Sequence, residues 1–234
     1  GNLDVVDDVA PEIAAENRRR IREAITAMLD AGTMPFVLGG DDSVPIPVLE
    51  SYCGFADGPI SILQIDAHID WRDEVDGEMQ GLSSNMRRAS EMAHVGSIVQ
   101  LAARGIGSAR KQEVEAALHY GVAFHTMRRL REAGGIERAI ADLPEGVPVY
   151  VALDVDSLDP SVMPAVIGAA QGGLDYWQMM DIFEAVAARA PICGFNMVEF
   201  MPARDANGQG ALMASRLGLS MLGLIARQMA RKAA

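Results

Sequence analysis

Acidic side chains and one histidine follow a hydrophobic stretch between residues 63 and 74. The sequence there is LQIDAHIDWRDE, in which Asp66, His68 and Asp70 are spaced two residues apart. Residues two apart in an extended chain point to the same side, so these three side chains can face a common point. A buried carboxylate is costly without a partner, so the cluster requires either solvent or a cation.

Three further acidic groups lie where other hydrophobic stretches end. GGDDS follows PFVL and contains Asp42, DVDSLDP follows VYVAL and contains Asp154 and Asp156, and Glu199 lies near the end of CGFNMV. Ligands of open α/β sheets bind beyond the carboxyl ends of the strands, so all four groups are expected at one edge. Carboxylates with one imidazole and no thiolate suit a hard or borderline divalent ion such as Mn²⁺. Their number suits two ions, as in two-metal hydrolases.

Hydrophobic and amphipathic stretches alternate along the chain. Strands that are apolar on both faces are typical of a parallel sheet covered by helices. We therefore predict an α/β fold, with residues 1–234 forming a single domain around a mainly parallel sheet flanked by helices. The predicted strands cover residues 34–40, 59–66, 97–103, 121–125, 147–156 and 191–200, and the predicted helices cover residues 12–32, 108–121, 127–143, 175–190 and 208–232.

The composition narrows the class of protein. A net charge of −12 disfavours nucleic acid and anionic membranes as partners and suits an enzyme with a cationic substrate. We expect no membrane-spanning stretch and no signal peptide at the start of the sequence. Cys53 and Cys193 are too few for a disulfide framework and lie in apolar surroundings, which predicts reduced thiols and a cytoplasmic location.

Four sequence blocks resemble the signature blocks of the ureohydrolase family, which includes arginases and agmatinases. They are GGDDS, DAHID, ALDVDSLDP and GFNMVEFMP, and the similarity runs from VVDDV at residues 5–9 to the last helix. The resemblance implies an arginase-like three-layer α/β/α fold and a centre of two Mn²⁺ ions, with Ni²⁺ or Co²⁺ as other possibilities. It also implies agmatinase-like hydrolysis of a small cationic guanidino substrate to urea and an amine, in a homo-oligomer (trimer or hexamer).

The resemblance also implies a role for each site residue. Asp66 and Asp156 would bridge the two ions, and His68 and Asp154 would each bind one ion. The metal set would be completed by Asp42 and by Asp70, which would also hold the bridging hydroxide as a catalytic residue. Glu199 would bind the substrate guanidinium and so take part in catalysis.

Departures from the family pattern leave alternatives open. The family usually has Gly-Gly-Asp-His-Ser where this chain has Asp42, and Leu82 stands where relatives carry a histidine. We also expect this chain to lack the family's N-terminal strand and loop. Asp42 fits a helix cap as well as a metal ligand, whereas Asp159 before Pro160 is typical of a turn. The alternative functions are a non-catalytic subunit and a hydrolase of an amide or formimino group.

Overall fold

The computed structural model describes residues 11–55, 58–107 and 109–233. Its strands form one six-stranded sheet in the order β1-β6-β5-β2-β3-β4, and every neighbouring pair is parallel. This confirms the predicted α/β class. The strands are β1 (Phe36–Leu38), β2 (Ile60–Ile65), β3 (Val95–Leu101), β4 (Ala123–His125), β5 (Val149–Asp154) and β6 (Ile192–Val198).

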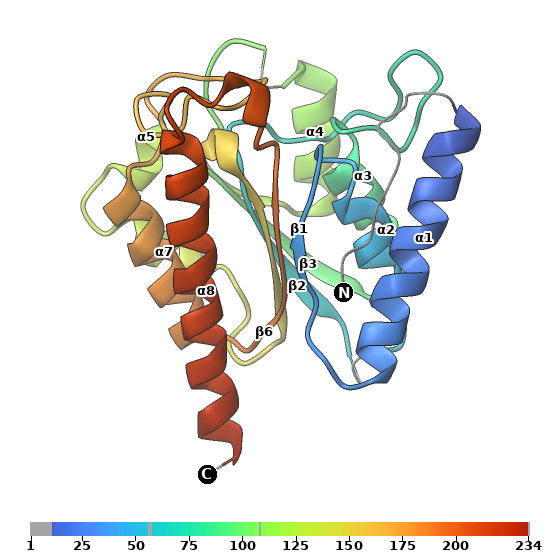
Figure 1. Cartoon of the computed structure of the whole chain (residues 1–234). Coiled ribbons are helices and arrows are strands. Elements are labelled where there is room, and N and C mark those ends of the chain that lie inside the picture. Colours follow the sequence, from blue (N-terminus) through green and yellow to red (C-terminus); the bar gives the residue numbers. More distant parts are fainter. Residues whose placement is uncertain (1–10, 56–57, 108, 234) are drawn as a thin grey trace.

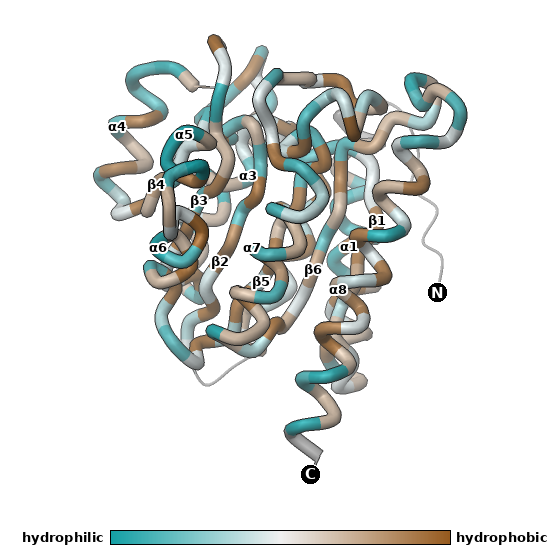
Figure 2. The backbone as a smooth tube through the Cα atoms, turned by 90° about the vertical axis from the view of Figure 1, so that its left-hand side faces the viewer, coloured by the Kyte–Doolittle hydropathy of each residue, from teal (hydrophilic) through white to brown (hydrophobic). Residues whose placement is uncertain are grey.

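The central strands are hydrophobic because helices cover both faces of the sheet (Figure 1). Every residue of β2, β5 and β6 is buried. Successive side chains alternate between the faces, so Ile60 and Ile62 enter one core while Leu63 and Ile65 enter the other. The hydrophobic residues along β2 and β3 are visible as brown segments between the helices (Figure 2).

The helices divide between the two faces in chain order. One core includes Ile21, Val48, Met86 and Ala117 from the first four helices. The other core includes side chains from the last four, among them Phe183 and Leu217. The first layer comprises α1 (Pro11–Asp30), α2 (Pro45–Glu50), α3 (Asn85–Ser90) and α4 (Lys111–Tyr120), and the second comprises α5 (Met127–Leu130), α6 (Gly135–Ala141), α7 (Tyr176–Arg189) and α8 (Gln209–Ala233).

The helix predicted over residues 127–143 is wrong, since α5 and α6 are separate helices. Gly134 has a left-handed backbone with φ of 70°. A Cβ atom at Gly135 would overlap the carbonyl oxygen of Arg129, so the chain turns back tightly at this point. The consecutive glycines allow the break, because an L side chain at either position would be strained or would clash.

The expectation that no stretch reaches the length of a membrane span is wrong for α8. Residues Gln209–Arg231 are long and apolar enough by length and composition. The helix nevertheless packs Leu217, Met221 and Leu224 into the core, whereas Leu212 is exposed. A core helix with one buried face satisfies the same criteria, so this finding alone is weak evidence of a membrane.

Two smaller expectations from the sequence have different outcomes. Cys193 is buried, as expected, but Cys53 is exposed rather than surrounded by apolar residues. The VVDDV segment, at which the family resemblance begins, lies outside the residues that the structure describes.

Candidate metal centre

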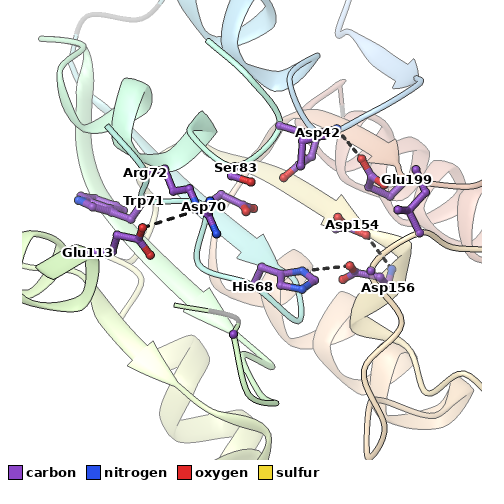
Figure 3. Close-up of a pocket in the computed structure, with 14 residues that line it drawn as sticks. Asp42, His68, Asp70, Trp71, Arg72, Ser83, Glu113, Asp154, Asp156 and Glu199 are labelled. Atoms are coloured by element: carbon purple, nitrogen blue, oxygen red, sulfur yellow. Dashed lines mark hydrogen bonds and ion pairs between the residues drawn. The ribbon is translucent and has the colours of Figure 1, made fainter. Parts of the chain in front are cut away.

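Carboxylates from separate strand ends meet at the carboxyl edge of the sheet (Figure 3). Donor atoms of Asp66, His68 and Asp156 lie within 4.8 Å of one another, and so do donor atoms of Asp42, Asp66 and Asp154. The structure thus brings together five of the six predicted metal ligands. Asp66 belongs to both groups, as a side chain shared between two cations would.

Short local hydrogen bonds turn these side chains toward the edge. The Asp66 carboxylate accepts the backbone N–H of His68 at 2.6 Å, and the Asp154 carboxylate accepts the backbone N–H of Asp156 at 2.7 Å. The second contact caps the short 3-10 helix η1 (Val155–Ser157), which directly follows β5. Nδ1 of His68 lies 3.1 Å from Oδ2 of Asp156, so the loops after β2 and β5 meet through this pair.

Burial and mutual repulsion make the cluster electrostatically unusual. Burial, and after it the charge of nearby Asp70, raise the pKa of Asp66 to about 7. Burial likewise raises the pKa values of Asp154 and Asp156. Hydrogen bonds to Asp156 and then to Asp66 raise the pKa of His68 to about 11. Positive charge therefore stabilises this arrangement, whether it comes from protons or from metal ions.

Asp70 lies beside the two groups without belonging to either. Nε2 of Gln64 donates to Oδ2 of Asp66 at 2.7 Å and to Oδ2 of Asp70 at 2.9 Å, which fixes the two carboxylates relative to each other. Gln100 donates to the side-chain oxygen of Gln64 and thereby orients its amide. Asp70 also has a left-handed backbone, with φ of 45°. The role of Asp70 as a ligand and the bridging role of Asp156, which belongs to one group only, stay predictions.

The structure favours the ligand reading of Asp42 over the cap reading. Its side chain is buried beside Asp66 and Asp154, and α2 has no side-chain cap. Neighbouring Asp41 accepts the backbone N–H of Ser43 at 3.0 Å instead. The Asn85 amide donates to the carboxylate and to the backbone carbonyl of Asp42, so α3 anchors this loop. Burial raises the pKa of Asp42 well above its usual range.

Glu199 follows β6 at the opposite side of the groups from Asp70 (Figure 3). Its Oε1 accepts the backbone N–H of Asp42 at 3.0 Å, and its own backbone is left-handed with φ of 66°. Burial raises its pKa to about 7. A non-glycine residue held in this conformation is strained, and such strain is frequent at functional sites.

A loop after β5 contributes Ile167 and Gly168 to the wall of the site. Asp159 accepts backbone N–H groups from Ser161, Gly172 and Gly173, as expected for a turn residue. Arg104 donates to the backbone carbonyls of Asp156 and Ala170 at 2.8 and 2.7 Å. It therefore connects this loop to the two groups of candidate metal ligands. These contacts hold Gly168 against the site, where a Cβ atom would lie 2.8 Å from Cε1 of His68 and 2.9 Å from Oδ2 of Asp156.

A pocket of about 240 Å³ opens onto these groups. Six of the seven predicted site residues line it, all except Asp66, and its wall also includes Leu82, at the position where relatives are expected to carry a histidine. Trp71 also lines it, but the ring is buried and packs on Tyr120, with 5.9 Å between centroids. Sequence reasoning missed the wall residues Arg72, Ser83, Glu113 and Gly168, and the supporting residues Gln64, Asn85, Gln100 and Arg104.

Comparison with known proteins gives consistent matches over most of the chain. The arginase family model matches residues 1–223. The chain is 34% identical to the mitochondrial arginase of Medicago truncatula over 200 residues, which is 84% of this chain and 57% of that protein. It is also 34% identical over 215 residues to N(1)-aminopropylagmatine ureohydrolase of Thermus thermophilus, covering 91% of this chain and 69% of that protein. The solved structure of arginase from Medicago truncatula superposes with a TM-score of 0.78 and 30% identity, covering 93% of this chain and 66% of that one.

Proposed function

Because this chain belongs to the arginase family, we propose that it is a metal-dependent amidinohydrolase that cleaves a guanidino C–N bond and releases urea and an amine. The observation that carries the proposal is the two groups of potential metal-binding side chains that share Asp66, because the other members of both groups line a pocket. The chain spans 57% of the length of the plant arginase that it matches, so the activity is inferred from this site and not transferred whole.

The donor set supports divalent metal. Its members are carboxylates and one imidazole without a thiolate, which suits Mn²⁺, with Co²⁺ or Ni²⁺ as alternatives. His68 and Asp156 would hold one ion, Asp42 and Asp154 the other, and Asp66 both. Bound ions of this kind lower the pKa of water and polarise the substrate.

The side chains around these groups have separate tasks in this proposal. Glu199 orients the guanidinium, since two carboxylate oxygens match paired N–H donors in a charge-assisted geometry. The buried Glu199 carboxylate regains its charge when that cation arrives, because the opposite charge lowers its raised pKa. Asp70 would hold the attacking hydroxide, as the family resemblance implies, and Gln64 keeps its carboxylate in position.

A urea-release screen tests the proposal. Purified protein is loaded separately with Mn²⁺, Co²⁺ and Ni²⁺, its metal content is measured, and a panel of guanidino compounds is assayed. We expect urea from at least one compound, and we expect the Asp66→Asn variant to lose both metal and activity. Protein that binds two ions but releases urea from none of the compounds would contradict the proposal.

Two other functions are alternatives to this proposal. A non-catalytic subunit is favoured by Asp42 and Leu82, where the family usually has histidines, and predicts no tightly bound divalent ion. A hydrolase of a formimino group would use the same donor groups with a different pocket and would release formamide and an amine, and an amidase would release a carboxylic acid and an amine or ammonia, in each case without urea. The metal analysis and an assay for formamide, carboxylic acid and ammonia in the same screen separate both alternatives from the leading proposal.

We also propose that the protein forms a homo-oligomer, a trimer or hexamer. The solvent side of α8 exposes Leu212, Leu219, Leu222 and Met229. Side chains of this kind, gathered along one helix, are typical of a surface that a second protein chain covers. Light scattering gives the test, since the chain mass is 25.0 kDa and a solution mass near that value would contradict the assembly.

A further inference from the structure

Arg72 brings a positive charge to a pocket whose other charged side chains, apart from His68, are acidic. Its backbone N–H donates to the carbonyl of Ser83 at 2.9 Å, and the preceding Trp71 is buried, so the residue is firmly placed. The side chain is 29% exposed and lies across the pocket from Glu199 (Figure 3). The pocket therefore has an anion at one end and a guanidinium at the other.

Arg72 lies next to Glu113, and the two side chains differ in how many hydrogen bonds they make. Glu113 has an exposed fraction of 12%, and its Oε2 accepts the backbone N–H of Arg110 at 2.7 Å. Its Oε1 lies 3.7 Å from Nε of Arg72 and 3.8 Å from Nε of Arg110. Among the described residues, no hydrogen bond reaches the terminal Nη1 and Nη2 atoms of Arg72. The Glu113 carboxylate already has partners, whereas the terminal Arg72 nitrogens have no hydrogen-bond partner in the described part of the chain.

We propose that Arg72 binds a carboxylate at the far end of the substrate, so that the enzyme acts on guanidino acids. The inference rests on the proposed function and names its substrate class. Glu199 takes the guanidinium end, the metal groups lie beneath the scissile C–N bond, and the two Nη atoms of Arg72 take the carboxylate as a bidentate pair. An arginine guanidinium stays charged at every working pH, so this end of the pocket remains cationic.

A guanidino amine such as agmatine fits this end poorly. Its ammonium would approach the Arg72 guanidinium, and the nearest anion, Glu113, is already shared between Arg72 and Arg110. Of the remaining pocket carboxylates, those of Asp42, Asp154 and Asp156 belong to the two donor groups and Glu199 lies at the other end. Asp70 already accepts a hydrogen bond from Gln64. The same wall that attracts a carboxylate therefore discriminates against the agmatine-like tail that the sequence resemblance predicts.

The experiment compares guanidinobutyrate with agmatine, which have similar chain lengths and opposite charges at the tail. Urea release by the metal-loaded protein gives kcat/KM for each, and their ratio reports tail recognition. We expect the ratio to favour guanidinobutyrate, and Arg72→Gln to lower it between about 10-fold and 100-fold, mainly through KM. Arg72→Lys keeps the charge and should restore part of the ratio.

Arg110→Gln is the matched control, because it removes the same charge near Glu113 from a side chain that is 63% exposed and does not line the pocket. Metal content and melting temperature of each variant are measured in parallel, and Arg72→Lys serves if Arg72→Gln does not fold. A wild-type preference for agmatine, or an equal change in Arg72→Gln and Arg110→Gln, would overturn the inference and leave the proposed function intact. Urea from none of the compounds would overturn both.

Discussion

Replacing Glu199 by glutamine tests the division of roles between metal binding and substrate binding. The substitution preserves the shape of the side chain and removes its charge. In the wild-type protein Oε1 accepts the backbone N–H of Asp42 at 3.0 Å. If the amide oxygen of the glutamine keeps that contact, its NH₂ group faces the substrate and offers a donor to a guanidinium that has only donors. If the amide turns over, the N–H of Asp42 loses its acceptor.

The size of the effect follows from this geometry. A hydrogen bond to a charged group contributes about 1.5–3 kcal/mol, and the carboxylate offers two such bonds to a guanidinium. Losing both costs ~3–6 kcal/mol, which is a decrease of roughly a hundred-fold to ten-thousand-fold in kcat/KM. Metal content should stay near the wild-type value, because Glu199 belongs to neither of the two donor groups.

The assay is urea release under steady-state conditions together with elemental analysis of the same protein preparation. Glu91→Gln is the matched control, because it makes the same chemical change at a side chain that is 49% exposed and outside the pocket. Loss of metal from Glu199→Gln would show that Glu199 helps to hold the ions. Full activity would refute the guanidinium role and favour the formimino or non-catalytic alternatives.

Three further predictions concern the metal groups. Asp42→His replaces a buried carboxylate by a neutral donor. It should change metal affinity or metal preference, measured in a competition between Mn²⁺ and Ni²⁺. Unchanged metal content and activity would show that Asp42 is only a supporting residue. Gly168→Ala should lower metal affinity and turnover at least about tenfold, because the added Cβ would crowd His68 and Asp156. A fully active variant that still binds metal would mean that the loop moves aside. Metal-free protein should lose stability as pH rises from about 4 to 7. Burial raises the pKa of Asp66 to about 7 in the folded state, so over this range the folded state binds a proton that the unfolded state has released. Melting temperatures across this range check the last prediction, and added Mn²⁺ should weaken the decrease because metal binds the deprotonated ligands.

Much of the fold and the convergence of the site were predictable because both depend on local patterns. The buried strands β2, β5 and β6 have continuous hydrophobic sequences, and a parallel sheet places all their carboxyl ends at one edge. Acidic residues that directly follow such strands must therefore lie near one another. That reasoning located Asp66 and Asp154 without any knowledge of their distance in space.

The supporting residues could not be predicted in the same way, because their partners are distant in sequence. Arg104 reaches a loop 66 residues away, and Asn85 contacts a loop 43 residues before it. Gln64 gave the clearest local signal, as a polar residue inside the buried strand SILQI, where an amide needs hydrogen-bond partners. The pairing of Arg72 with Glu113 depends on where α4 packs, and charge spacing along the chain gives no indication of that packing.

Strained and buried residues of the candidate metal centre also couple it to the stability of the fold. Asp70 and Glu199 hold left-handed backbone conformations, each of which costs about 1–3 kcal/mol. Asp42, Asp66 and Asp154 are buried together, and their repulsion is relieved only by protons or by cations. Divalent ions in the two groups would replace those protons and stabilise the folded state at neutral pH. Asp42 strengthens this dependence, because it adds a negative charge where relatives are expected to have a neutral imidazole. Asp42→His should therefore make the metal-free protein more stable at neutral pH even where it weakens metal binding, and a metal-free variant that melts below the wild-type protein would contradict the coupling.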